Sequence, residues 1–290
     1  MKRRLIAFLA VLTLALGAST AVAASQVIVT PSNQQGWSSG SPYAETRDGG
    51  TVTFVADSTA PGSPNRGALE LTTPLLPTSA KAQYMHATAT LLATVTELGY
   101  WTKQVSATFP MGDPSYQLQV CLNGATATGC NPNGAPFTNS SFTTLVFEPY
   151  QNTAQGLVVN NVWQSWDVDQ GLFWSTRTVQ CSSGLIAGTP GGPAAYTLAQ
   201  VRTRCPNAIA VAFGVDIGSN NPAYVVRTDL VDFNGTVYNF EPDSTKPGCS
   251  DGQGSFQDRG NHGGDGPKTH ECKNGNDKSD NNEDGQDSED

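Results

Sequence analysis

The chain has 290 residues, of which 38% are hydrophobic and 14% charged, and its formal net charge at pH 7 is −9. An acidic chain without a basic stripe has no electrostatic means of holding a phosphate backbone, which excludes nucleic acid as a partner.

The first 24 residues match a secretory signal peptide. Lys2, Arg3 and Arg4 form a positive start, and the apolar segment 5–17 is too short to cross a bilayer. Small residues around Ala23 and Ala24 then allow cleavage. We therefore expect a secreted or otherwise extracytoplasmic protein, with no membrane span after the signal is removed.

Short strands separated by Gly, Pro, Asn and Ser are expected throughout residues 25–242. One helix is expected over 196–205, closed by Pro206, while 89–99 fits either a helix or a strand. This pattern predicts an all-β fold, a single jelly-roll-like β-sandwich with one short helix. The expected strands are 26–30, 51–56, 68–73, 116–122, 143–149, 162–168, 172–175, 208–216, 224–233 and 236–241.

Six cysteines, an even number, indicate disulfides formed in an oxidising compartment. Zinc is not expected, because the chain has no C-x-x-C spacing. Proximity in sequence favours neighbours as partners, although other pairings stay open. The predicted pairs are Cys121 with Cys130, Cys181 with Cys205, and Cys249 with Cys272.

Four segments resemble a known group of proteins: LVFEPY at 145–150, VWQSWD at 162–167 followed by Trp174, TLAQV…PNA at 197–208, and DLVDFNGTVYNFEP at 229–242. The chain is similar in these segments to uncharacterised exported bacterial proteins with a jelly-roll or concanavalin-like β-sandwich domain. That domain ends in an FNG-x-x-Y-x-FEP motif. The resemblance implies the fold and export, and it implies no catalytic or ligand-binding residue.

Catalytic signatures are sparse. His86 is the only histidine in residues 25–242, and no nucleophile motif accompanies it. Sandwich glycosidases use paired carboxylates, but Asp229 and Asp232 differ by an odd number and face opposite sides of a regular strand. A glycoside-active enzyme is therefore kept only as an alternative, and no catalytic residue is assigned.

Aromatic residues favour glycan binding, because sugar rings stack their apolar faces on aromatic side chains. Trp166 and Trp174 flank the segment DVDQG at 167–171, which we expect to form a hairpin turn that presents one of them to solvent. Trp101 and Tyr150 are further candidates for ligand contact. Trp163 must face the opposite side from Trp166, and a role in the sandwich core remains the competing interpretation for each tryptophan.

Residues 243–290 form an acidic segment with 12 Asp or Glu against 5 Lys or Arg and almost no large apolar side chain. Such a composition predicts a disordered tail. Its DNNEDGQDSED stretch at 280–290 resembles the start of a calcium loop but lacks the flanking helices and twelfth ligand of an EF-hand. We expect no metal site and no cofactor, and at most weak calcium uptake by the tail.

The sequence thus predicts an exported, non-catalytic binding protein, with an extracellular glycan or another surface polymer as its partner. The alternatives are a glycoside-active enzyme on the same sandwich and a structural protein of the cell envelope.

Overall fold

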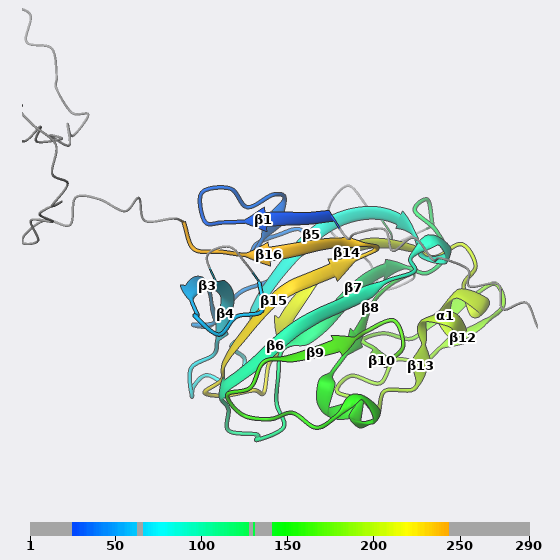
Figure 1. Cartoon of the computed structure of the whole chain (residues 1–290). Coiled ribbons are helices and arrows are strands. Elements are labelled where there is room, and N and C mark those ends of the chain that lie inside the picture. Colours follow the sequence, from blue (N-terminus) through cyan, green and yellow to red (C-terminus); the bar gives the residue numbers. More distant parts are fainter. Residues whose placement is uncertain (1–24, 63–65, 128–129, 131–140, 244–290) are drawn as a thin grey trace, which may run out of the picture. The chain divides into compact units, whose positions relative to one another are not determined.

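The computed structural model describes residues 25–62, 66–127, 130 and 141–243 (Figure 1). The predicted signal peptide, the predicted acidic tail beyond residue 243 and the pair Cys249 and Cys272 lie outside these residues. None of the helices described there is long and apolar enough to cross a membrane.

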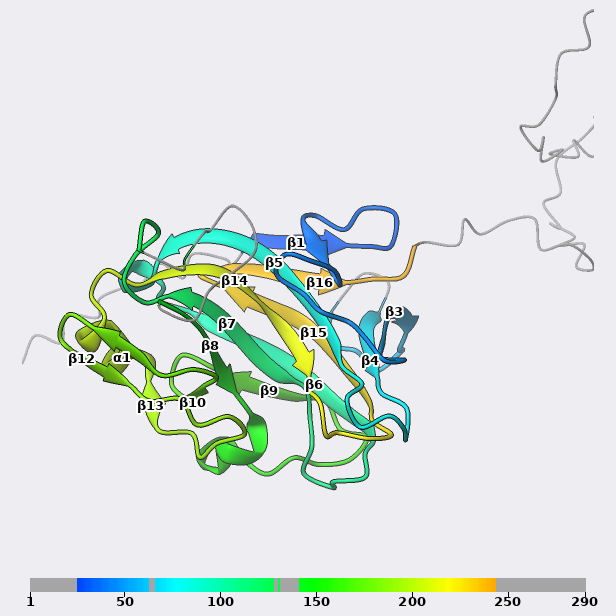
Figure 2. The ribbon, with the colours of Figure 1, turned by 180° about the vertical axis from the view of Figure 1, so that it is seen from behind.

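Two seven-stranded sheets make up the molecule (Figures 1 and 2). The first, called sheet I, contains β1 (Ser25–Val29), β3 (Thr51–Ala56), β4 (Gly67–Thr72), β6 (Leu98–Ser106), β9 (Gln164–Asp167), β15 (Val225–Phe233) and β16 (Thr236–Phe240). The second, called sheet II, has the order β13-β10-β8-β7-β14-β5-β2. Its strands are β13 (Tyr196–Thr197), β10 (Leu172–Ser175), β8 (Phe142–Phe147), β7 (Ser115–Cys121), β14 (Ile209–Ile217), β5 (Ala82–Leu91) and β2 (Trp37–Ser38).

The sheets pack face to face around one main hydrophobic core. Phe213 of sheet II stacks on Phe233 of sheet I with ring centroids 4.2 Å apart and planes 7° from parallel. The hydroxyl of Tyr116, on β7, donates to the backbone oxygen of Asp232, on β15, over 2.9 Å. The prediction of an all-β sandwich with one short α-helix is confirmed.

Strand β15 organises sheet I, because it pairs with β6 along one edge and with two strands in turn along the other. Residues 225–228 pair with β4, and residues 231–233 pair with β16. The register shifts between Asp229 and Asp232, where Leu230 has a φ of 47°. This bulge turns the end of the strand toward the closing motif of the domain.

In sheet II the strand β7 is buried on both faces. Tyr116, Leu118 and Val120 enter the main core, so the alternation of a strand directs Gln117 and Gln119 to the opposite, outer face. That outer face is therefore enclosed enough to bury polar side chains, and it carries the pockets described below.

The smaller elements complete the fold. β11 (Val179–Cys181) and β12 (Gly184–Ile186) form a separate two-stranded sheet, and α1 covers Leu198–Arg204. Three 3-10 helices, η1, η2 and η3, cover Leu92–Thr94, Pro149–Gln151 and Thr153–Gln155. The helix begins with a capping box between Thr197 and Gln200, and it ends before Pro206.

Each of the ten expected strands coincides with an observed strand, to within a few residues at its ends. Segment 89–99 is neither of the two expected forms: β5 ends at Leu91, η1 follows, and β6 begins at Leu98. β2, β5, β6, β11, β12 and β13 were not expected as such. The structure contains the disulfides Cys121–Cys130 and Cys181–Cys205, as the proximity of these cysteines predicts.

The expected hairpin at 167–171 is wrong. β9 ends at Asp167 in sheet I, whereas β10 begins at Leu172 in sheet II, so the segment between them crosses from one sheet to the other. Trp166 and Trp174 therefore belong to different layers of the sandwich.

Candidate functional site

Two adjoining pockets lie on the outer face of sheet II. Pocket A has a volume of about 430 Å³ and is lined by the loop around Phe109–Asp113, by Glu148, Tyr150 and Trp174, and by residues 216–221. Pocket B has a volume of about 350 Å³ and is lined by residues of β5, β7 and β8 together with Thr176 and Arg177. Both include Gln117, so together they form one groove, of the size that suits a small ligand or a segment of polymer.

The aromatic wall of pocket A is fixed by hydrogen bonds. Trp174 lies opposite Val146 in the register of β10 and β8, and its Nε1 donates to Oε2 of Glu148 over 2.7 Å. Gln151 donates to the same carboxylate oxygen. Tyr150, on η2, meets the ring of Phe109 edge to face with centroids 5.5 Å apart. Two half-buried aromatic rings are thus held at the pocket in defined orientations.

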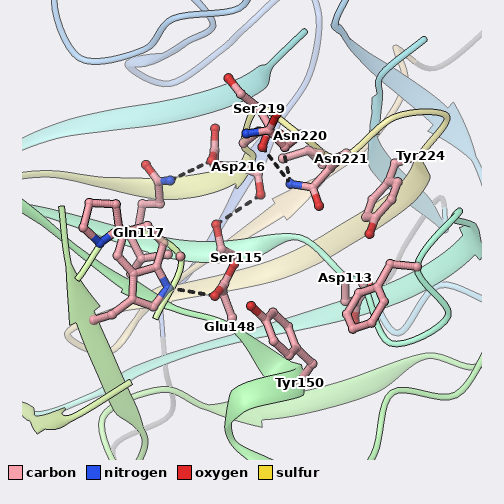
Figure 3. A pocket seen from close by; sticks show the side chains of 18 residues that line it. Asp113, Ser115, Gln117, Glu148, Tyr150, Asp216, Ser219, Asn220, Asn221 and Tyr224 are labelled. Carbon is pink, nitrogen blue, oxygen red and sulfur yellow. Dashed lines mark hydrogen bonds between the residues drawn. The ribbon is translucent and has the colours of Figure 1, made fainter. Parts of the chain in front are cut away.

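A chain of polar side chains forms the floor between the pockets. Gln117 donates to Oδ2 of Asp216 over 2.7 Å (Figure 3). Gln83 donates to the amide oxygen of Gln117. Nζ of Lys81 lies 3.6 Å from the other oxygen of Asp216. Burial raises the pKa of Asp216, which is only 4% exposed, while the charge of Lys81 opposes that shift.

Two further carboxyl groups of pocket A lack a basic partner among the described residues. The carboxyl of Asp113 is enclosed, although the residue as a whole is only half-buried, and burial raises its pKa to about 8. Its Oδ2 accepts from the hydroxyl of Thr102, and its Oδ1 has no hydrogen-bond partner in the described part of the chain. Burial also raises the pKa of Glu148, against the opposing hydrogen bonds from Trp174 and its neighbours. Pocket A therefore combines carboxyl groups, of which Asp113 and Glu148 hold their protons more tightly than usual, with aromatic rings.

The structure brings together two of the four residues predicted to contact a ligand, because Trp174 and Tyr150 both line pocket A. Trp166 is a correction: it is 2% exposed, pairs with Tyr100 on the core side of sheet I, and donates its Nε1 to Thr102. Its ring offers no face to a ligand. Trp101 follows the buried Tyr100 on β6 and is half-buried on the outer face of sheet I, away from the groove.

The polar side chains at the floor of the groove were not among the predicted ligand-binding residues. Gln117 and Gln119 alternate with apolar residues in YQLQV, a pattern that places both amides on one face and could have identified them. Asp216 follows the apolar run AIAVAFGV near the end of β14. An acidic residue directly after a buried run is the sequence signal that could have identified it. Asp113 lies in a loop without any distinguishing pattern.

No group of His, Cys, Asp and Glu side chains in the described ranges has the geometry of a metal site.

No protein-family model and no curated protein matches the chain. Among solved structures, a family 11 carbohydrate-binding module from Clostridium thermocellum, in complex with a β-1,3-1,4-mixed-linked tetrasaccharide, is similar with a TM-score of 0.38 and 10% identity. That similarity covers 71% of this chain and 92% of the module. The family 11 module of the cellulosomal cellulase Lic26A-Cel5E of the same organism gives a TM-score of 0.33 and 11% identity over 68% of this chain and 86% of the module. Both TM-scores are too low to assign a function, which rests instead on the residues of the groove.

Proposed function

We propose that this protein binds an extracellular glycan without chemically altering it, and that the groove on the outer face of sheet II is the binding site. The observation that carries the proposal is pocket A, where Trp174 and Tyr150 stand beside buried carboxyl and amide groups on a rigid sheet. A sugar offers apolar C–H faces to aromatic rings and hydroxyl groups to polar side chains, so this combination matches its chemistry.

The rings are held before any ligand arrives. The bond from Trp174 to Glu148 and the edge contact between Tyr150 and Phe109 restrict rotation of both aromatic side chains. A binding site whose side chains are already ordered loses less conformational entropy on association, which favours affinity for a flexible polymer. Oδ1 of Asp113 has no partner in the described part of the chain and is left for a sugar hydroxyl.

Hydrolysis is the second candidate, because pocket A contains carboxyl groups with raised pKa values, as active sites often do. A glycosidase needs a protonated carboxyl and an ionised one on either side of the scissile bond. Here Asp216 forms an ion pair with Lys81 and accepts a hydrogen bond from Gln117, and Glu148 accepts a hydrogen bond from Trp174. These partners favour binding over catalysis. A structural envelope protein, the third candidate, would have no use for an ordered aromatic pocket.

The test is a glycan-array screen of the full chain, followed by titration calorimetry with the glycan that binds best. Trp174→Ala should weaken binding by about thirtyfold or more, since alanine substitution of a central aromatic contact costs at least about 2 kcal/mol. Trp101→Ala, which removes a half-buried tryptophan from the other sheet, is the matched control and should bind like the wild type. Equal affinities for all three proteins would refute the groove as the site.

A reducing-sugar assay on the same glycan separates binding from hydrolysis. We expect no release of reducing ends by the wild type. Turnover that Glu148→Gln abolishes would show that the protein is a glycosidase and that the non-catalytic assignment is wrong.

A further inference from the structure

Pocket B contains an arginine whose charge is not used by the fold. Arg177 follows the end of β10, and its backbone is fixed on both sides: its N–H donates to Thr143 over 3.0 Å, and its carbonyl accepts from Ser175 over 2.8 Å. The guanidinium carbon lies 5.1 Å from the ring centroid of Phe142. Among the described residues it makes no ion pair or hydrogen bond, and its Nη1 is shielded from solvent without a partner.

The other charged groups that line pocket B are already paired. Lys81 faces Asp216, and the carboxylate of Glu45 lies 2.5 Å from Nη1 of Arg47. Arg177 is therefore the uncompensated charge of this pocket within the described part of the chain. A guanidinium on an aromatic ring presents its N–H groups in a fixed plane, which suits a carboxylate or another planar anion.

An unused acceptor accompanies this donor. Gln119 donates its amide N–H to the carbonyl of Tyr43 over 2.6 Å, while its Oε1 is buried and lacks a hydrogen-bond partner among the described residues. A buried amide oxygen without a donor is unfavourable, so its presence in a pocket points to a ligand that supplies one. A ligand that complements pocket B would therefore carry an anionic group to pair with Arg177 and a hydroxyl to donate to Gln119.

We propose that pocket B binds one uronic acid unit of the glycan, whose carboxylate pairs with Arg177 and whose hydroxyl donates to Oε1 of Gln119. This inference rests on the proposed function, because it names the class of glycan that the same groove takes.

The spacing of the two pockets fits adjacent sugar units. Trp174 lines pocket A and Thr176 lines pocket B, and Thr176 directly follows the last residue of β10, two positions after Trp174. Two residues of chain span at most about 7 Å, a distance on the scale of a sugar unit. A chain with one ring against Trp174 therefore extends its neighbouring unit toward Arg177.

Pocket A does not repel such an anionic chain as strongly as its three carboxyl groups suggest. Lys81 compensates Asp216, and burial raises the pKa of Glu148 and that of Asp113, the latter to about 8. At neutral pH most of the Asp113 population keeps its proton and donates a hydrogen bond instead of carrying a charge.

The test compares acidic polymers with their own neutral forms. Polygalacturonate, alginate and glucuronoxylan are titrated into the full chain, each beside the same polymer with its carboxyl groups reduced to alcohols. We expect one acidic polymer to bind about tenfold to a hundredfold more tightly than its reduced form, the range of a charge-assisted hydrogen-bonded pair. The difference should shrink as salt is added.

Variants assign the preference to the pocket. Arg177→Gln should bind the acidic and reduced polymers equally. Arg204→Gln is the matched control, because Arg204 also lies over an aromatic ring, 5.0 Å from that of Tyr196, but lines neither pocket of the groove. It should keep the full preference. Gln119→Leu should weaken both polymer forms alike and tests the pocket independently if Arg177→Gln does not fold.

The remaining outcomes overturn the inference in distinguishable ways. If the wild type bound acidic and reduced polymers equally, or if Arg177→Gln kept the full preference for the acidic form, pocket B would not recognise a carboxylate. The proposed function would be unaffected by either result. Dextran sulfate bound through Arg177 in preference to every uronate polymer would make the anion a sulfate ester. No binding of any glycan, acidic or neutral, would remove the proposed function itself.

Discussion

The interior between the sheets and the groove on sheet II contain the same kinds of side chain, a tryptophan and buried carboxyl groups, in different surroundings. Trp166 and Trp174 each donate their indole N–H over 2.7 Å, the first to Thr102 and the second to Glu148. The first ring is enclosed by the core, and the second lines a pocket. Hydrogen bonds of the same length thus fix both rings, one inside the core and the other at a pocket where a ligand can contact it.

The carboxyl groups of the two regions differ in what they bind. In the interior, Asp229 accepts from the backbone N–H groups of Phe240 and Gly62 over 2.9 and 3.2 Å, and Glu241 accepts from that of Gly67 over 2.7 Å. A Cβ on Gly67 would lie 2.2 Å from Cδ of Pro242 and 2.8 Å from Cα of Glu241, so this close approach of the two chain segments requires glycine. In the groove, Asp216 and Glu148 accept mainly from side chains and face a cavity.

Burial raises the pKa of Asp229 to about 7 and that of Asp113 to about 8, so a raised pKa does not distinguish the two regions. The partners distinguish them. Backbone donors are part of the fold, and a carboxyl that satisfies them has a structural role. The closing segment FNGTVYNFEP is explained by this role, because its Phe240 and Glu241 complete the interior network.

The largest expected effect separates the two tryptophans. Trp166→Ala should lower the free energy of unfolding by about 3–5 kcal/mol, because it empties a core site and removes a buried hydrogen bond. Trp174→Ala should lower it by less than about 2 kcal/mol, since the ring is only half-buried. Denaturant titration measures both. Comparable losses of stability would mean that the ring of Trp174 also has a core role.

The next effect concerns the interior carboxyl. Asp229→Ala leaves the N–H groups of Phe240 and Gly62 without acceptors, and at about 1–2 kcal/mol for each buried orphan we expect a loss of about 2–4 kcal/mol. Asp229→Asn keeps one acceptor and should lose roughly half as much. Glycan affinity below the melting temperature should be unchanged in both. Weakened binding at full stability would contradict the separation of the two regions.

The layers of this fold follow from the sequence more readily than its site does. The alternation in YQLQV and TVTFVA and the helix stop at Pro206 are local signals, and the structure has the expected element at each. Which face of a strand becomes a groove depends instead on loops that close over it from distant parts of the chain. Odd spacing correctly placed Trp163 and Trp166 on opposite sides, but only the assembled sheets show that Trp166 faces the core.

The third prediction is the pH dependence of stability. A carboxyl with a pKa raised in the folded state binds its proton more tightly there, so the free energy of unfolding falls as the pH rises from its unfolded value, 3.8, to its folded one. The folded values are about 6 for Asp232, about 7 for Asp229 and about 8 for Asp113, raised by burial in each case. Thermal unfolding should therefore show a decline in stability from about pH 5 to pH 8.

Two variants divide this decline between the regions. Asp113→Asn should reduce the slope up to about pH 8, including the range above about pH 7, whereas Asp229→Asn should reduce it only below about pH 7. Asp57 acts in the opposite sense: burial alone would raise its pKa, but hydrogen bonds from Thr59, Lys103 and Arg227 lower it below the usual range. The contribution of the Asp57 carboxylate to the free energy of unfolding is present above about pH 4 and is lost in stronger acid. A stability that rises from pH 5 to pH 8 would contradict the burial of these groups.

The smallest effect on stability is expected for Glu148→Gln, and it addresses the comparison most directly. The amide oxygen can still accept the indole N–H of Trp174, so the ring keeps its place and the free energy of unfolding should change by less than about 1 kcal/mol. Glycan binding should weaken by about threefold to tenfold, because a neutral amide accepts a weaker hydrogen bond than a carboxylate. Glu148→Ala, which also releases the indole, should weaken binding further at a similar stability. A loss of more than about 2 kcal/mol in Glu148→Gln would place this carboxyl with Asp229, as a structural group of the fold, and would remove the distinction on which the groove is assigned.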